Sequence, residues 1–318
     1  MHRIICSDKL LIIPIPPRKT GCWRDMSGPA RFERCQEKGG ICLSKDSHLD
    51  REELDFWEAQ TRCGDAIDLK LARDLPDDTP DYILEMMENF EEQASEFCFF
   101  GARGRVLDAG CGNGNLLLRA LKKEKGRGAD GQLALQAVGM DFSGNMLGRA
   151  ADRAGDDGRA AFLRGSVTSL PFRDGSFDHV VSSGVLTCLP HIEAAEAALR
   201  EFYRILKPEG TLAVDFFNRS SHYTLIRRHI FKESIKPPEY MTPAEFYRAL
   251  QEAGFAVVSC RGFDFKPCQG YLFLSRWRGM IDPGYIQERL STFLEQRIDP
   301  GKGLNLLGYR IYVRCVRK

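Results

Sequence analysis

The sequence contains no C-x-x-C pair, although it has 11 cysteines among its 318 residues. Cysteines paired at that spacing are typical of zinc ribbons, and cysteine-dense short chains are typical of disulfide scaffolds. Neither class fits this chain. We therefore expect reduced thiols in a cytoplasmic protein, with no bound metal. Cys22, Cys35 and Cys42 form the single weak candidate for a metal site.

Long apolar runs are also absent. The longest near the start, Leu10 to Ile15, is interrupted by Pro14 and is far shorter than the roughly 20 residues that span a bilayer. It lacks the long apolar region and small-residue cleavage site of a signal peptide. We expect no transmembrane segment.

The chain has little excess charge of either sign, with a formal net charge of +1. Such a balance gives no general support for a nucleic-acid partner or a membrane surface. What the chain does have is a hydrophobic content of 43%, enough for a substantial core.

Three regions differ in their residue pattern. Residues 1–50 are rich in Pro, Gly, Cys and Arg, which predicts a poorly ordered N-terminal extension. Residues 51–100 show helical spacing, above all over 81–100, and predict a helical cap. Residues 101–318 alternate strands and helices, which predicts one α/β domain with insertions at 218–241 and 263–307. The expected strands cover 104–109, 134–141, 160–164, 177–183, 210–217, 255–260 and 309–316. The expected helices cover 114–125, 144–154, 191–206 and 242–253.

The most informative stretch is Arg105 to Gly114, which reads RVLDAGCGNG. A buried strand ends at Asp108, a glycine turn follows, and a helix begins just beyond it. Glycines allow positive φ and close backbone approach, and a helix start offers unpaired N–H groups, so the stretch predicts a ligand cradle. The G-x-G-x-G spacing differs from the dinucleotide fingerprint G-x-G-x-x-G, which argues against a nicotinamide dehydrogenase. A carboxylate at Asp108 would repel a pyrophosphate but favour an ammonium group. A generic glycine turn of another α/β domain is the alternative.

Further motifs follow in order. Asp141 ends the second expected strand, where an acid can accept hydrogen bonds from two ribose hydroxyls. The alternative is that Asp141 serves only as a cap of the next helix, in competition with Ser143. Asp178 is expected to be structural, and His191 is expected to open a helix rather than to act in catalysis. The other stretches are Arg164 to Phe172, Asp174 to Leu186, and Glu201 to Asp215, in which Lys207 to Gly210 is expected to form a structural turn.

Together these motifs resemble the class I S-adenosylmethionine-dependent methyltransferases of the type 11 family, over residues 81–262 and the end of the chain. The resemblance implies a Rossmann-like class I fold, with a mostly parallel seven-stranded sheet and helices on both faces. It implies S-adenosyl-L-methionine as the methyl donor and in-line attack by the acceptor on the methyl group. The residues implied to bind the donor are Asp108, Gly110, Cys111, Gly112, Gly114, Asp141, Phe142, Ser166, Val167 and Ser183.

Two departures from the family pattern bear on the chemistry. Ser166 stands where an acidic residue that contacts adenine is common, so this contact would be weaker. Thr187 and Cys188 stand where many relatives carry a histidine pair, so no base is available from that pair.

The acceptor is only weakly indicated. Basic and aromatic residues interleave over 219–236, a pattern that more often marks a solvated helix face than a substrate surface. A small organic or lipid-like molecule is the expected acceptor, with His222, Tyr223 and Tyr240 as acceptor-side candidates. The alternatives are a module that binds the donor without catalysis and an RNA-modifying methyltransferase.

Overall fold

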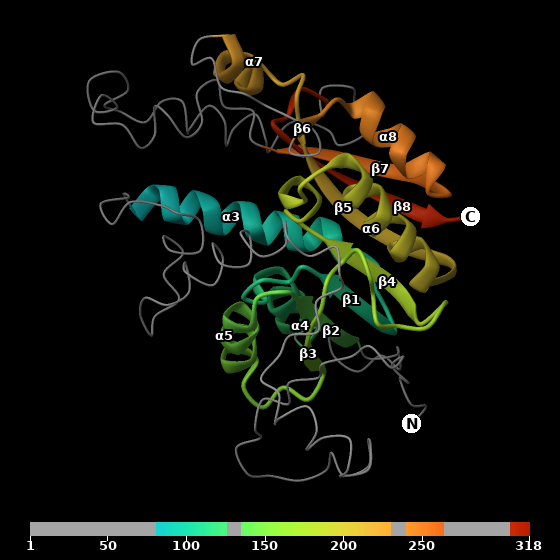
Figure 1. Cartoon of the computed structure of the whole chain (residues 1–318). Helices are drawn as coiled ribbons and strands as arrows, with labels where there is room; N and C mark the ends of the chain where they lie inside the picture. The colour runs from blue at the N-terminus through green and yellow to red at the C-terminus, as the bar shows by residue number, and fades with distance from the viewer. Residues whose placement is uncertain (1–80, 126–134, 230–239, 264–305) are drawn as a thin grey trace.

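The strands of this protein form a single sheet in a computed structural model that describes residues 81–125, 135–229, 240–263 and 306–318 (Figure 1). Its strand order is β3-β2-β1-β4-β5-β8-β7, and the two-residue strand β6 pairs with β5 off this path. The strands are β1 (Arg105–Ala109), β2 (Gln136–Asp141), β3 (Ala160–Arg164), β4 (Phe177–Ser182), β5 (Leu206–Asn218), β6 (Tyr240–Met241), β7 (Phe255–Phe263) and β8 (Arg310–Arg317). The predictions for residues 1–80 and for most of the insertion at 263–307 fall outside the described residues.

The sheet is mostly parallel. Strands β3, β2, β1, β4 and β5 pair in parallel, whereas β8 is antiparallel to both β5 and β7. The predicted Rossmann-like sheet of seven main strands is thereby confirmed. Its last strand in chain order, β8, lies between two strands that precede it.

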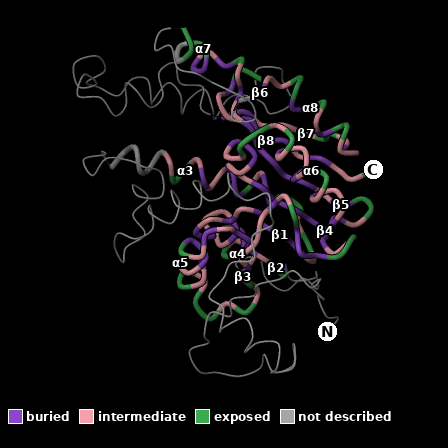
Figure 2. The backbone as a smooth tube through the Cα atoms, viewed as in Figure 1, coloured by how far each residue is buried: buried purple, intermediate pink, exposed green. Residues whose placement is uncertain are grey.

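Helices cover both faces of the sheet (Figure 1). The helices are α3 (Asp81–Cys98), α4 (Asn115–Lys125), α5 (Gly144–Ala154), α6 (Ile192–Ile205), α7 (His222–His229) and α8 (Pro243–Glu252), with a 3-10 turn, η2, at Leu186–Cys188. Helices α3 and α4 share one hydrophobic cluster with the sheet, and α6 and α8 share the other. The buried residues concentrate in the strands between these layers, as Figure 2 shows.

The two clusters divide neighbouring residues of each strand. Leu107 and Val180 belong to the cluster of α6 and α8, whereas Val106 and Val181 belong to that of α3 and α4. Successive side chains of a strand point to opposite faces, so a strand covered on both faces buries neighbouring apolar residues. This explains the adjacent apolar pairs Val106-Leu107 in β1 and Val180-Val181 in β4.

Three helices begin at the caps that their sequences indicate. The Ser143 hydroxyl accepts from the Met146 amide at 3.3 Å, and His191 Nδ1 accepts from the Ala194 amide at 3.2 Å. Thr242 forms a reciprocal capping box with Glu245. The predictions that His191 opens a helix and that α8 starts at Thr242 are confirmed.

Strand β5 starts earlier than expected. Leu206 already pairs with Phe177 of β4, and the pairing resumes at Thr211 opposite His179. The prediction of a strand beginning at 210 after a separate turn is therefore wrong at its start. The intervening residues form an irregularity within β5, where Glu209 has a φ of 61°.

Candidate functional site

The glycine turn joins the end of β1 to the start of α4. Gly110 has a φ of 81° and Gly112 a φ of 54°, values that L side chains rarely adopt. A Cβ on Gly110 would lie 2.1 Å from Cγ2 of Val185, just beyond β4, whereas a Cβ on Gly112 would meet no atom within 4 Å. At Gly110 the turn therefore packs against the segment Ser183 to Val185, which directly follows β4 and is called the exit of β4 below. At Gly112 the turn leaves space.

Asp108 lies beneath this turn at the carboxyl end of β1. Its side chain is buried, and no hydrogen bond to its carboxyl is found among the described residues. Burial, and secondarily the charge of Asp141, raises the pKa of Asp108 to about 7. A buried carboxyl of this kind fits a ligand group that brings both a positive charge and N–H donors.

Asp141 links the end of β2 to the glycine turn. One carboxylate oxygen accepts from the Gly112 amide at 2.8 Å and the other from the Ser143 amide at 2.9 Å. Burial raises the pKa of Asp141, and these amide hydrogen bonds oppose that rise. Ser143, not Asp141, caps α5. A carboxylate has about four acceptor positions, so two amides leave capacity for hydroxyl donors.

Neighbouring helices hold the turn on both sides. Arg153 of α5 donates to the backbone carbonyl of Asn113 at 3.0 Å and to its side-chain oxygen at 3.3 Å. Asn115, the first residue of α4, donates to Glu91 of α3 at 2.5 Å. Sequence reasoning missed these four residues because the contacts join segments 24 and 40 residues apart.

Four more of the predicted donor-site residues lie in the glycine turn or just after β2 and β3. Cys111 is buried, with its sulfur against Gly139, where a Cβ would come within 2.9 Å. The Phe142 carbonyl accepts from Arg164 at 2.7 Å. Val167 is buried, and the Ser166 hydroxyl lies 2.9 Å from that of Thr168, so it is already in local contact.

Ser183 directly follows β4 and lies close to the last strand. Its hydroxyl is 2.8 Å from the Tyr312 hydroxyl and accepts from Arg310 at 3.1 Å. The structure therefore brings β1, β2 and β4 together at one edge through the contacts of Gly110, Gly112 and Val185. Carboxyl ends of parallel strands are where α/β sheets bind ligands.

Comparison with known proteins agrees with this geometry. A methyltransferase-domain family matches residues 107–214. The ubiquinone/menaquinone biosynthesis C-methyltransferase UbiE of Methylobacterium nodulans is 30% identical over 188 residues, which cover 49% of this chain and 68% of that protein.

The chain belongs to the class I S-adenosylmethionine-dependent methyltransferases of the type 11 family.

Two further curated relatives and one solved structure extend the comparison. The demethylmenaquinone methyltransferase of Thermus thermophilus is 34% identical over 126 residues, which cover 39% of this chain and 52% of that protein. The magnesium protoporphyrin IX methyltransferase of Synechocystis, a structure with bound S-adenosylhomocysteine, shares the fold at a TM-score of 0.51 and 14% identity, covering 86% of this chain and 98% of that one. Another of the most similar relatives is an uncharacterized Haemophilus influenzae protein, of which the chain covers 61%.

The site fits the family's methyl donor, S-adenosylmethionine. The donor carries an ammonium group and ribose hydroxyls, and the turn offers the carboxyls of Asp108 and Asp141 with open space at Gly112. The individual contacts of the predicted residues stay predictions.

The acceptor-side candidates of the methyltransferase lie around the end of β5. Tyr223 is buried, with its ring edge-on to Tyr309 at 4.6 Å between centroids, and Tyr309 stacks on Phe217. Tyr240 of β6 pairs through its backbone with Phe217, and half-buried His222 opens α7. Their proximity to one strand end agrees with a shared role, which stays a prediction.

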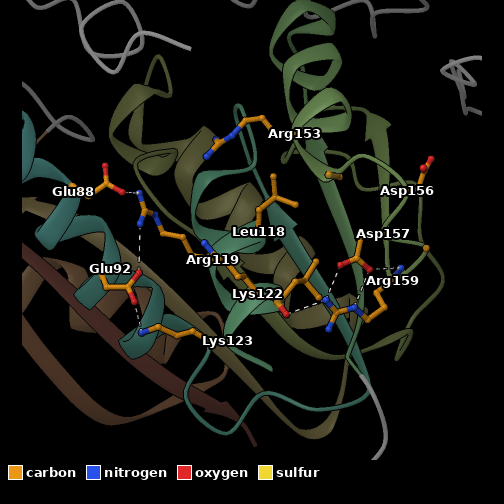
Figure 3. Close-up of a pocket in the computed structure, with 13 residues that line it drawn as sticks. Glu88, Glu92, Leu118, Arg119, Lys122, Lys123, Arg153, Asp156, Asp157 and Arg159 are labelled. Atoms are coloured by element: carbon orange, nitrogen blue, oxygen red, sulfur yellow. Dashed lines mark hydrogen bonds and ion pairs between the residues drawn. The ribbon is translucent and has the colours of Figure 1, made fainter. Parts of the chain in front are cut away.

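A groove with charged walls runs along the outer side of the methyltransferase's α4, facing α3 and the loop after α5 (Figure 3). Arg119 pairs with Glu88 at 2.7 Å, Lys123 with Glu92 at 2.6 Å, and Arg159 with Asp157. None of its lining residues belongs to the glycine turn. Because its charges of both signs pair with one another, the groove is not the basic channel that a nucleic-acid backbone requires.

Within the described part of the chain, no helix is both long enough and apolar enough to cross a membrane.

Proposed function

We propose that this chain transfers the methyl group of S-adenosylmethionine to a small, lipid-like organic acceptor by in-line displacement. The observation that supports this most strongly is the glycine turn with the buried carboxyls of Asp108 and Asp141 at its base. The acceptor's lone pair forms the new bond to the methyl carbon while the carbon–sulfur electron pair returns to sulfur. The products are the methylated acceptor and S-adenosylhomocysteine.

The residues of the chain act by holding the reactants rather than by bonding to them. Asp108 receives the ammonium group, Asp141 receives the ribose hydroxyls, and the exit of β4 borders the methionine moiety and its methyl group. Holding two reactants in line can lower a barrier by about 7–11 kcal/mol. A base is required only when the acceptor loses its proton before or during the attack.

The lipid-like acceptor class is supported by two observations. Relatives of the chain are named as a ubiquinone/menaquinone biosynthesis C-methyltransferase and a demethylmenaquinone methyltransferase, names that point to quinone-type acceptors. The candidates at the end of β5 are accompanied by the rings of Phe217 and Tyr309, which suit an apolar and planar partner.

Calorimetric titration of the full chain with S-adenosylmethionine and S-adenosylhomocysteine, with NAD as the control ligand, tests the donor site. Assays for methyl transfer to quinol-type, phenolic and RNA acceptors then test the reaction. Donor binding without transfer to any acceptor would favour the non-catalytic module. If neither S-adenosylmethionine nor S-adenosylhomocysteine binds, the proposal is overturned.

Replacing Asp141 by alanine is expected to weaken S-adenosylhomocysteine binding about tenfold or more, since a charge-assisted hydrogen bond contributes about 1.5–3 kcal/mol. Ser143→Ala is the matched control, because it removes the cap of α5 but leaves the carboxylate. Calorimetry on folded variants measures both affinities. An unchanged affinity in Asp141→Ala would refute the ribose assignment.

Affinity for S-adenosylhomocysteine is expected to rise roughly tenfold between about pH 6 and pH 8. The raised pKa of Asp108, about 7, leaves its carboxyl mostly protonated at the lower pH, whereas the ligand's ammonium binds the ionised form. Asp108→Asn should flatten this profile. The same slope in both proteins would show that another group is responsible.

A further inference from the structure

Residues of β8 reach across the sheet to the exit of β4. Tyr312 pairs with Asp215 of β5 in the register of the sheet, and Arg310 pairs with Phe217. Ser183, which directly follows β4, lies on the other side of β5. Strand β8 can reach Ser183 because it is inserted beside β5.

Four hydrogen bonds connect these residues into one network. Arg310 donates through Nε to Asp215 and through Nη2 to the Ser183 hydroxyl at 3.1 Å. Asp215 accepts from the Gly184 amide at 2.6 Å, and the Tyr312 hydroxyl lies 2.8 Å from that of Ser183. One ion pair thereby fixes both the side chain of Ser183 and the backbone that follows it.

The ion pair at the centre of the network is buried. The side chain of Asp215 is 0% exposed and that of Arg310 is 14% exposed. The guanidinium lies over the rings of Phe90, Phe217 and Tyr312, with 5.1–5.5 Å between its carbon and the centroids. Cation–π contacts of this kind attract the guanidinium to the rings and so favour this orientation.

The network also reaches the glycine turn. A Cβ on Gly184 would lie 3.1 Å from Arg310, and Val185 fills the space above Gly110. The segment Ser183 to Val185 is thus held by β8 on one side and contacts the donor turn on the other. A buried ion pair contributes little net stability compared with apolar packing, so stability alone does not account for this arrangement.

We propose that Arg310 is a positioning residue for the methionine moiety of the donor. Together with Asp215 and Tyr312 it fixes the Ser183 hydroxyl and the backbone after β4 against that moiety. This inference rests on the proposed function, because it places the donor's amino-acid end at the exit of β4.

Two ligands separate positioning from general support of the fold. S-adenosylhomocysteine carries the amino-acid chain, whereas 5′-methylthioadenosine has the same adenosine and sulfur without it. Tyr312→Phe deletes only a hydroxyl, and Arg310→Lys keeps the positive charge near Asp215 but loses the planar fork that reaches two partners. Arg314→Met is the matched control on β8, since Arg314 donates to the Phe100 carbonyl, away from this network.

Both variants are expected to bind S-adenosylhomocysteine about fivefold to tenfold more weakly, as the loss of one hydrogen bond implies, and to bind 5′-methylthioadenosine like the wild type. Ser183→Ala should reproduce the loss, and adding Tyr312→Phe to it should cause no further loss, because both act through one hydroxyl. The Arg314→Met control should bind both ligands normally.

Equal weakening of both ligands, or full additivity of Ser183→Ala and Tyr312→Phe, would overturn the positioning role while leaving the proposed function in place. Failure of the wild type to bind either ligand would overturn the proposed function itself. Thermal unfolding of each variant ensures that the comparison is between folded proteins.

Discussion

Substituting Gly110 by alanine is expected to weaken S-adenosylhomocysteine binding about a hundredfold. The new Cβ would lie 2.1 Å from Val185, and the φ of 81° at this position disfavours any L side chain. Overpacking of this kind costs about 1–3 kcal/mol and the left-handed conformation about 1–2 kcal/mol. Relief requires the turn and the exit of β4 to separate, which displaces the groups that line the donor site. Calorimetry with S-adenosylhomocysteine measures the effect.

Gly101→Ala is the matched control for this prediction. It adds the same methyl group at a φ of 71° between α3 and β1, outside the donor turn, and no atom lies within 4 Å of the new Cβ. It therefore retains the conformational cost and lacks the clash, and its affinity should fall less than that of Gly110→Ala. Equal losses would show that the contact with Val185 does not matter for the site.

Acidification from about pH 6.5 to pH 4 is expected to remove about 3 kcal/mol of stability through His179. Burial lowers the pKa of His179 to about 4 from an ordinary value of 6.5. Its Nε2 donates to the Cys98 carbonyl at 2.7 Å, and its Nδ1 is in hydrogen-bond contact with the Thr211 hydroxyl. The folded state thus binds fewer protons than the unfolded state between these pH values, so stability is present above this window and lost as the pH falls through it.

The measurement is the difference in unfolding free energy between the wild type and His179→Gln at several pH values. Asp108, with its raised pKa of about 7, contributes with the opposite sign, losing stability as the pH rises, but it is common to both proteins and cancels. The stability advantage of the wild type should shrink by about 3 kcal/mol from pH 7 to pH 4. His191→Gln, at an exposed helix cap, is the control; a constant difference for His179→Gln would contradict the prediction.

Local features of the fold were predictable from the sequence. The helix over 144–154 coincides with α5, and its cap at Ser143 needs only residues three positions apart. The glycine turn was also predictable, because its spacing determines its conformation. In each case the physical cause lies within a few residues of the effect.

Features that depend on distant segments were not predictable. The early start of β5 follows from the pairing of Leu206 with Phe177, and Ser183 meets Tyr312 across 129 residues of chain. Likewise, the hydrogen bond from the Gly112 amide to Asp141 joins residues 29 positions apart. A single sequence does not show which residues far apart in the chain come into contact in the fold.

The insertion of β8 has a consequence for how the protein is made. While the chain leaves the ribosome, β5 and β7 are both available before the strand that joins them has been synthesised. Until Arg310 to Arg317 emerges, the edge of β5 that β8 will occupy offers unpaired backbone groups, a state that favours mispairing. The same late strand carries Arg310 and Tyr312, so a nascent chain completes this part of its sheet and its network at the exit of β4 in one event, when β8 has been made.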